Sequence, residues 1–583
     1  MKSFSIRRPW TFVIFGIILV GFIATQIPAA YASQWNFFGS DDIWFGRFTH
    51  AAWVDTHNIF SVLNAAFYTA AHVWQNWQGN FTAVVMFALN PAVFDEDGMH
   101  NWAGPWVVIG FLLAGTIILT KVILSNYLKA TWEVSLSVGF LLGIIFTQLV
   151  PSYRSAFLWW AAAVNYGVFL GLIFMMIACF LKYFRAKGWK KGLYYGLGAF
   201  LACFVAGGMY VFHTFLLVGF LGTLAIKEQV YKNKKGRLLY LIFIPFAILS
   251  MINILAPGNL NRMASVEASA IRNPFLAIFE SYAYAIKETI WAASTGSGEA
   301  QAPPNGVNFA YLAMVVLVAI LCWAVVKRVN FKFRMPGLIT VLSVTAYASY
   351  YTPFIYAQGI DVRPRVFDCG YYIWWMVMIL NFIWWMGWLK PRLVRYHKQH
   401  KKFFSQRFFG NSYSLAQGVA VPVLLIAFCL GYFNMTNYVN GYLGVRPGAL
   451  ANYDAVTQEY VASGQAPNQD GTMTQGLVHF GRTLPEVNMD YINQFKADLA
   501  KSDGSVTLPD TRENDKLLTA HLDMCPEPGY GYNSYAETYW NKEHVQAYYP
   551  NETTVSWWMN PQTDEEYYQQ KVNSCAGQEH LNA

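Results

Sequence analysis

Charged residues are scarce in this sequence. They make up 13% of its 583 residues, whereas a soluble domain carries about 25%, so an ordinary soluble fold is excluded. Nucleotide-binding and hydrolase motifs are also missing, since the chain has no P-loop, no dinucleotide fingerprint and no GxSxG. Neither CxxC nor HExxH spacing occurs, so no motif indicates a metal site. Apolar residues dominate instead and make up 55% of the chain.

The apolar residues gather in long runs. Runs of about 17 to 25 residues can cross a hydrocarbon core of about 30 Å. The first run is too long, and too often followed by others, to be only a cleaved signal peptide. The 191–226 region could be two spans or one long helix with an interfacial extension. We expect eleven spans, near 9–32, 102–124, 131–150, 157–181, 191–209, 210–226, 238–256, 307–326, 336–355, 370–389 and 414–437.

The basic residues test this topology. If the N-terminus is inside, eleven spans place every basic cluster on the cytoplasmic side, as the positive-inside rule requires. Moving or dropping one span would put several clusters outside. The net charge of +8 is therefore a topological signal rather than a sign of a nucleic-acid partner. The clusters lie at 7–8, 121–129, 182–191, 227–237, 327–334 and 390–402.

The segment 438–583 differs in composition from the rest. It carries 19 Asp and Glu against 8 Lys and Arg, and it includes strand-like stretches at 506–508 and 554–557 among helix-like ones. Its length is enough for a small core. We expect an all-α polytopic membrane domain over 1–437, with a long first external loop at 33–101, and a small α+β extracytoplasmic C-terminal domain. The expected location is the plasma or inner membrane.

The first external loop combines acids, amides and aromatic rings. Asp41 and Asp42 follow the first span directly. Two adjacent acids cannot both ionise easily when partly desolvated, so we expect one pKa to rise and one acid to be able to serve as a base. Rings that stack and amides that pair with hydroxyls suit a sugar. The alternative is an interfacial aromatic belt in which Asp42 pairs with Arg47. The expected sugar- or acceptor-binding residues here are Arg47, His57, Trp74 and Gln78.

Three further groups lie at predicted outer ends of spans. Guanidinium groups grip phosphate oxygens through paired hydrogen bonds, so external arginines suit a lipid-linked phosphate. For each arginine the alternative is a snorkelling anchor. The other side chains could instead form helix contacts or an ordinary Pro-Gly-Asn turn. The expected phosphate ligands are Arg154, Arg262, Arg363 and Arg365, and further expected sugar- or acceptor-binding residues are Tyr153, Trp160, Asn165, Tyr166 and Asn259.

These motifs occur together in one known family. They are the early Asp41-Asp42 pair, the Trp-Gln-Gly turn that ends the first loop, FLWWAAAVNY, APGNLNR and the arginine-bearing loop after the ninth span. In this order the chain resembles the GT-C class of bacterial membrane glycosyltransferases, near the GtrII-type O-antigen glucosyltransferases, over most of its length. One position differs, because His213 lies where such relatives have an acid. We expect His213 to contact the sugar or acceptor.

The resemblance implies a transferase on the outer leaflet. It would use a polyprenyl-phosphate sugar as donor and an envelope glycan or lipid as acceptor. Asp41 is the expected base, with Asp42 as orienter or second acid, although the sequence does not separate the two. The base would remove the proton of an acceptor hydroxyl in a single inverting displacement, and arginines would stabilise the departing phosphate. No cofactor follows from the resemblance, and a divalent metal stays open.

Two other functions remain open at this stage. A transporter or flippase for a lipid-linked sugar would also have many spans, but it should show ionisable residues at mid-span and internal repeats. Here the charges crowd at the outer ends, and no convincing repeat is found. A non-catalytic envelope scaffold would use the C-terminal domain to bind partners and the outer charges as anchors.

Cys525 and Cys575 generate the first testable prediction. They are the only cysteines of the segment 438–583, and an even pair in an oxidising compartment predicts a disulfide. We expect mass spectrometry without reductant to find the two peptides linked. Cys322, which lies in a predicted span and should pack as a small apolar residue, is the internal control for a free thiol. Two free thiols in the segment would contradict the prediction.

Overall fold

The structure is a computed structural model that describes most of the chain up to residue 399 and four short strands beyond it. The described residues are 8–33, 40–95, 101–127, 131–148, 150, 154–266, 271–287, 309–328, 331–360, 362, 364–399, 478–479, 482–483, 505–508 and 554–557.

Helices make up nearly all of the described chain up to residue 399. This agrees with the apolar composition, because a segment in hydrocarbon must pair its backbone groups internally. Two elements, η1 and η5, are 3₁₀-helical, and η2, η3 and η4 are π-helical. In chain order the elements are α1 (Arg8–Ser33), α2 (Ser40–Thr56), α3 (Ile59–Asn76), α4 (Phe81–Ala88), η1 (Pro91–Phe94), α5 (Gly104–Lys121), η2 (Val122–Tyr127), α6 (Trp132–Gln148), η3 (Arg154–Leu158), α7 (Trp160–Ala163), η4 (Val164–Val168), α8 (Phe169–Tyr183), α9 (Trp189–Ala206), α10 (Val211–Gln229), η5 (Arg237–Ile242), α11 (Phe243–Ile254), α12 (Pro257–Val266), α13 (Pro274–Ile286), α15 (Phe309–Arg328), α16 (Pro336–Gln358) and α17 (Pro364–Gln399).

A helix lies at each of the first ten apolar runs of the sequence. Within the described ranges, six helical stretches are long and apolar enough to cross a membrane. The 191–226 region holds two helices, α9 and α10, that separate at Gly207 and Gly208. The eleventh run, 414–437, lies outside the described residues. The six stretches are Gly104–Tyr127, Trp160–Tyr183, Val211–Gln229, Arg237–Ile254, Pro336–Gln358 and Arg365–Leu393.

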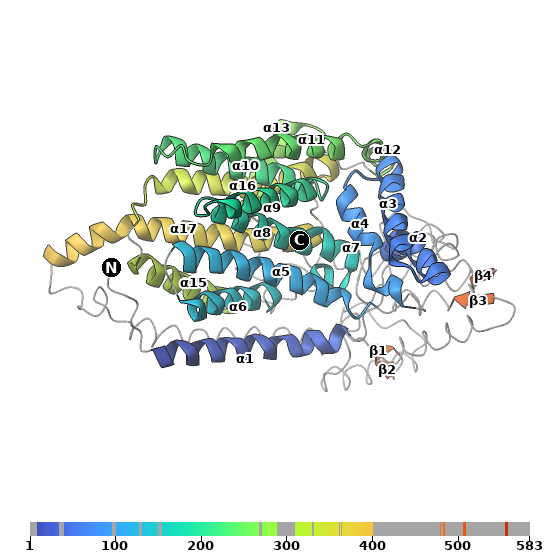
Figure 1. Cartoon of the computed structure of the whole chain (residues 1–583), viewed down its shortest axis with the longest axis horizontal. Coiled ribbons are helices and arrows are strands. Elements are labelled where there is room, and N and C mark those ends of the chain that lie inside the picture. The colour runs from blue at the N-terminus through green and yellow to red at the C-terminus, as the bar shows by residue number, and fades with distance from the viewer. Residues whose placement is uncertain are drawn as a thin grey trace, which may run out of the picture.

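The long helices form a bundle with shorter helices across one end. Figure 1 shows α5, α8, α16 and α17 lying alongside one another, while α2, α3, α4 and α12 gather at one end of them. Buried side chains of the long helices form one continuous apolar cluster. The first external loop is therefore largely helical, and its helices close one end of the bundle.

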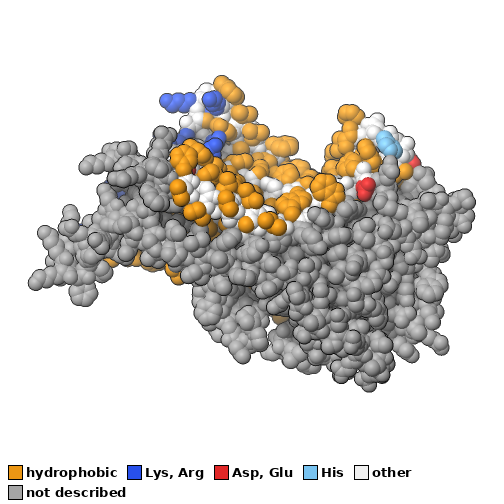
Figure 2. Space-filling view, turned by 90° about the horizontal axis from the view of Figure 1, so that it is seen from below, with side chains coloured by type: hydrophobic (Ala, Val, Ile, Leu, Met, Phe, Trp, Pro, Cys, Tyr) orange, Lys and Arg blue, Asp and Glu red, His pale blue; other side chains and the backbone are white. Residues whose placement is uncertain are grey.

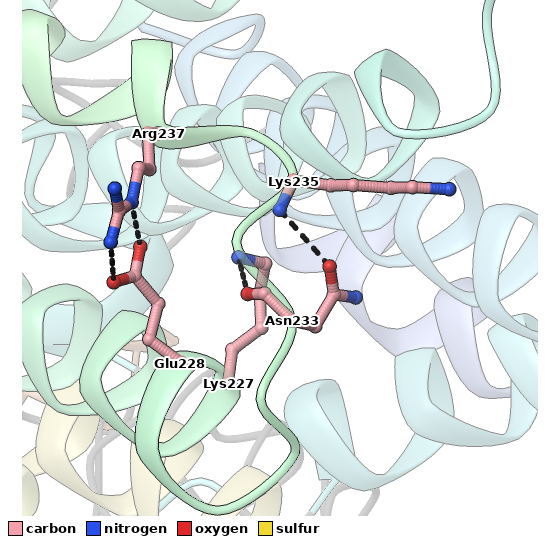
Figure 3. A network of polar contacts seen from close by, with 5 residues as sticks. All are labelled: Lys227, Glu228, Asn233, Lys235 and Arg237. Atoms are coloured by element: carbon pink, nitrogen blue, oxygen red, sulfur yellow. Dashed lines mark hydrogen bonds and ion pairs between the residues drawn. The ribbon is translucent and has the colours of Figure 1, made fainter.

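The two ends of the bundle differ in charge. Figure 2 shows an apolar face with Lys and Arg side chains at one end and acidic and His side chains at the other. At the basic end, the connection between α10 and η5 is held by an ion pair of Arg237 and Glu228 at 3.0 Å (Figure 3). Basic clusters that are distant in sequence meet here, since Arg334 donates to the carbonyl of Val230 at 3.2 Å.

Helix α13 lies outside the predicted spans. The segment 257–306 lies between two predicted spans, and the expected topology makes it external; within it, α13 packs along the apolar α16. Its buried side chains are the small residues Ala277, Ser281 and Ala285, spaced four apart, which allow two helices to approach closely. At 13 residues α13 is too short to count as a predicted span.

Two turns that are distant in sequence pack backbone against backbone at the end where α2, α3 and α12 lie. The N–H of Gly79, after α3, donates to Oδ1 of Asn259 at 3.0 Å. A Cβ on Gly79 would overlap the carbonyl of Asn253, and one on Gly258 would overlap the backbone of Trp77. Only glycine permits this approach, so the Trp-Gln-Gly and Ala-Pro-Gly-Asn motifs form a joint between α3 and α12.

Four short strands are described beyond the helices. β1 (Val478–His479) pairs antiparallel with β2 (Arg482–Thr483). β3 (Ser505–Leu508) pairs parallel with β4 (Thr554–Trp557), and these two strands cover the strand-like stretches of the sequence. The rest of the predicted C-terminal domain lies outside the described residues.

The joint between α3 and α12 generates a stability prediction. Gly79→Ala should lower the thermal midpoint of the detergent-solubilised protein by several degrees, because overpacking costs about 1–3 kcal/mol. Gly110→Ala in α5 is the matched control, since a Cβ there meets no heavy atom within 4 Å. Equal midpoints for the two variants would contradict the joint.

Candidate functional site

The first turn of α2 places a carboxylate inside the protein. Asp42 is 2% exposed, and its Oδ1 accepts a hydrogen bond from the N–H of Ala161 at 3.0 Å. Trp159, the N-cap residue of α7, makes no side-chain capping bond. Asp42 therefore caps α7 from another helix, in a place where backbone N–H groups stabilise negative charge.

Arg365 meets the same segment from α17. Its guanidinium carbon lies 4.7 Å from the centroid of the Trp159 ring, and Trp159 is two residues before Ala161. Arg365 also interacts electrostatically with Tyr166, which is 4% exposed. Asp42 and Arg365, which are more than 300 residues apart in the sequence, therefore both contact the stretch 159–166.

Arg262 contributes a second positive charge from α12. Its Nη1 donates to Oε1 of Gln78 at 2.8 Å, and its guanidinium carbon lies 5.3 Å from the centroid of the Trp77 ring. It also interacts electrostatically with Tyr166. A predicted phosphate ligand and a predicted sugar ligand, Arg262 and Gln78, are therefore direct partners.

We call Asp42, Trp159, Tyr166, Arg262 and Arg365 the acid–arginine cluster. It joins four parts of the chain: α2, the 159–166 stretch, α12 and α17. A carboxylate can accept a proton, and two guanidinium groups can stabilise a departing anion. The cluster therefore contains the groups that are needed when a hydroxyl displaces a phosphate from carbon: a base for the hydroxyl proton and positive charge for the departing phosphate.

Two π-helical segments, η3 and η4, flank the residues that carry the cluster. π-Helical turns are rare and occur often at functional sites, because they re-aim side chains within a helix. The continuous apolar pattern of 157–181 does not predict these π-helical turns.

Asp368 is a further buried acid that was not among the predicted site residues; it is 2% exposed and follows Arg365 by about one turn of α17. The sequence feature that could have identified Asp368 is its position as an acid at the start of a predicted span, where charge is costly.

Three predicted sugar-binding residues hold the protein together. The indole N–H of Trp160 donates to backbone carbonyls of α4, and that of Trp74 donates to a carbonyl of α11. Asn259 accepts from the N–H of Gly79 and donates to the carbonyl of Asn253. The polar groups of these three side chains form hydrogen bonds within the protein. This agrees with the alternative to sugar binding, in which such residues form helix contacts or an ordinary turn.

Arg47 lies on α2 and His57 directly follows it, and both face away from the cluster. The guanidinium carbon of Arg47 is 4.7 Å from the centroid of the Phe48 ring. Burial lowers the pKa of Arg47, and the nearby Tyr68 opposes that shift. His57 is exposed at the far end of α2, roughly 20 Å along the helix from Asp42 at about 1.5 Å per residue.

Asn165 and His213 are both buried, and Asn165 adjoins the cluster. Asn165 immediately precedes Tyr166, and its Nδ2 donates to Sδ of Met209 at 3.3 Å. The His213 ring packs edge-on against Phe246. The remaining predicted site residues lie outside the described residues or have side chains outside them, and these are Asp41, Tyr153, Arg154, Arg363, Cys525 and Cys575.

The fold and cluster define the class: a helix bundle with helices long and apolar enough to cross a membrane, and a cluster at one end that joins a buried acid to two half-buried arginines. No protein-family model matches the sequence, and no curated protein matches it. Within the described ranges, no group of three or more His, Cys, Asp and Glu side chains is arranged to hold a metal ion.

The cap that Asp42 provides generates a prediction. Asp42→Asn keeps an oxygen that accepts from Ala161, whereas Asp42→Ala removes it. We expect Asp42→Ala to cost about 1–2 kcal/mol, as a lost helix cap does, and Asp42→Asn to cost less. Thermal melts in detergent measure both. Asp55→Ala, an exposed acid on the same helix, should leave the midpoint unchanged. If Asp42→Ala melted like Asp55→Ala, the cap would not matter to the fold.

Proposed function

We propose that the protein is a membrane glycosyltransferase that moves a sugar from a polyprenyl-phosphate donor to a hydroxyl of an envelope glycan or lipid. The observation that carries the proposal is the convergence of buried Asp42 and Arg365 on the 159–166 stretch, with Arg262 interacting electrostatically with Tyr166 of that stretch. An acid that can take a proton and arginines that can hold a phosphate are needed at opposite ends of the same displacement.

Asp42 is the candidate base whose side chain the structure describes, and Asp41 stays the other candidate. The bond of Asp42 to the N–H of Ala161 fixes its position, and a carboxylate has about four lone-pair sites, so it can accept from more than one donor. In the proposed step the carboxylate takes the hydroxyl proton as the oxygen attacks the anomeric carbon. The bond from that carbon to the phosphate oxygen breaks, and inversion follows.

The two arginines are the candidates for the leaving group. The lipid phosphate gains negative charge as the sugar departs, and guanidinium groups present paired donors to it. Both arginines lie against aromatic rings, Trp159 and Trp77, which holds each side chain in one orientation. The donor phosphate would therefore lie between α12 and α17.

The charge distribution supports an extracytoplasmic site. The cluster lies with α2 and α12 at one end of the bundle, and the basic connection 227–237 lies at the other (Figures 1 and 2). Lys and Arg favour the cytoplasmic side. In the proposed topology all eleven predicted spans cross the membrane, and the acid–arginine cluster faces the outer leaflet, where a polyprenyl-linked sugar would be used.

The base is tested by Asp42→Asn, with Asp41→Asn beside it. The protein is reconstituted in liposomes with undecaprenyl phosphate carrying a panel of sugars and with an envelope extract as acceptor, and release of undecaprenyl phosphate is measured. We expect Asp42→Asn to lower the rate at least about 100-fold while its thermal midpoint stays closer to that of the wild type than that of Asp42→Ala. Asp55→Asn is the control and should keep the wild-type rate.

The arginines are tested in the same assay. Arg365→Ala should lower the rate by about 100-fold or more, and Arg365→Lys should restore part of it, because one charge remains without the paired donors. Arg237→Ala, at the opposite end of the bundle, should have the wild-type rate. Full activity in Asp41→Asn, Asp42→Asn and Arg365→Ala, or no transfer by the wild type from any sugar of the panel, would refute the proposal.

A further inference from the structure

Asn80 is an N-cap residue whose side chain does not cap. It precedes α4, yet it makes no side-chain capping bond. Asn58, Asn90 and Asn273 precede helices in the same way, and each accepts from the backbone of the helix that follows. Asn80 is 3% exposed, and neither Oδ1 nor Nδ2 has a hydrogen-bond partner among the described residues. Capping therefore does not explain this asparagine.

Asn165 is a second buried amide with unused capacity. It comes from the π-helical segment η4 and is 9% exposed. Its Nδ2 donates to Sδ of Met209, and a thioether is a weak acceptor. Its Oδ1 has no partner within the part of the chain that the structure describes.

His213 is the third such side chain. It lies in the first turn of α10 and is 4% exposed. Its ring interacts weakly with the backbone of Ala206, but neither ring nitrogen has the geometry of a full hydrogen bond to a described residue. A neutral imidazole offers one donor and one acceptor, so the His213 ring can both donate to a ligand and accept from it.

The α9–α10 turn is a common neighbour of these three residues. The backbone two residues after Asn80 donates to the carbonyl of Gly207 at 2.9 Å. Met209, in the same turn, accepts from Asn165. His213 follows Met209 by about one helical turn. Five polar atoms without hydrogen-bond partners among described residues therefore belong to three residues that all adjoin this turn.

The chemistry of the three side chains selects a ligand. Buried polar groups are nearly always paired, and an unpaired one costs free energy. Two amides and an imidazole offer donors and acceptors without a full charge when the imidazole is neutral, which suits hydroxyl groups better than phosphate or ammonium. We infer that Asn80, Asn165 and His213 form an uncharged subsite that binds the hydroxyl groups of a sugar.

This subsite rests on the proposed function and divides the donor between two places. Tyr166 follows Asn165 directly and interacts with Arg365 and Arg262. The arginines would hold the phosphate, and the amide–imidazole group would hold the sugar attached to it. The reacting carbon would then lie where the two places meet, close to the 159–166 stretch.

A pair of asparagines separates a binding role from a structural one. Asn90 is 1% exposed, and its Oδ1 accepts from the N–H of Ala92 at 3.0 Å. Asn90→Ala should lower the thermal midpoint of the ligand-free protein by several degrees, because a cap is lost. Asn80→Ala should leave that midpoint unchanged or raise it, because no hydrogen bond is lost.

Binding is then measured with bare undecaprenyl phosphate and with undecaprenyl phosphate that carries glucose, galactose or mannose. We expect the wild type to bind one sugar-bearing lipid about tenfold more tightly than the bare lipid, which a few net hydrogen bonds supply. Asn80→Ala and His213→Phe should bind the two lipids alike. Their affinity for the bare lipid should not change, since the arginines are intact.

The inference is overturned if Asn80→Ala melts as low as Asn90→Ala, if it keeps the wild-type preference, or if the wild type binds all four lipids equally. A wild-type protein that prefers a sugar-bearing lipid but transfers no sugar would support the subsite and contradict the transferase. Transfer by the wild type with an unchanged preference in Asn80→Ala would contradict the subsite alone.

Discussion

The hydrogen bond from Ala161 to the buried carboxylate of Asp42 is the contact on which the arrangement of the site depends. Removing a charge from water costs several kcal/mol unless charge or hydrogen bonds compensate for it, and the beginning of α7 offers backbone N–H groups that do so. The bond ties α2 to the segment on which Arg365 stacks. The Asp42 carboxylate and the Arg365 guanidinium, which are distant in sequence, therefore contact residues 161 and 159 of the same segment.

A second constraint positions the other arginine. The close approach of Gly79 to the turn that contains Asn259 holds α12 against the end of α3. Arg262 lies on that helix and bonds to Gln78, one residue before Gly79. The conspicuous glycines of the sequence thus act on the site indirectly, because they fix the helices that carry its charges.

The sequence predicts the helices well where a long apolar run determines them. Six described stretches have the length and composition to cross a membrane, since burying an apolar run in hydrocarbon requires a helix. It does not predict α13, because a short helix with Ala277, Ser281 and Ala285 on its buried face lacks the length of a span. The helices of the first external loop depend on packing against the bundle rather than on a long apolar run.

The candidate site was predicted in its parts but not in its connections. Asp42, Arg262 and Arg365 stand out in the sequence because charge is scarce there, whereas their meeting at 159–166 depends on tertiary packing and on π-helical turns that no local pattern indicates. Trp160 and Asn259 show the opposite case, since conspicuous side chains turn out to bond within the protein. Asn80 was inconspicuous because an asparagine before a helix normally has a capping role.

The most direct test of the account is a density map of the protein in lipid nanodiscs with an undecaprenyl-phosphate sugar bound. The account predicts phosphate density between Arg262 and Arg365, with the sugar beside Asn165 and its anomeric carbon facing the carboxylate of Asp42. Phosphate density at the basic end of the bundle, near 227–237, or a sugar far from Asp42, would contradict it.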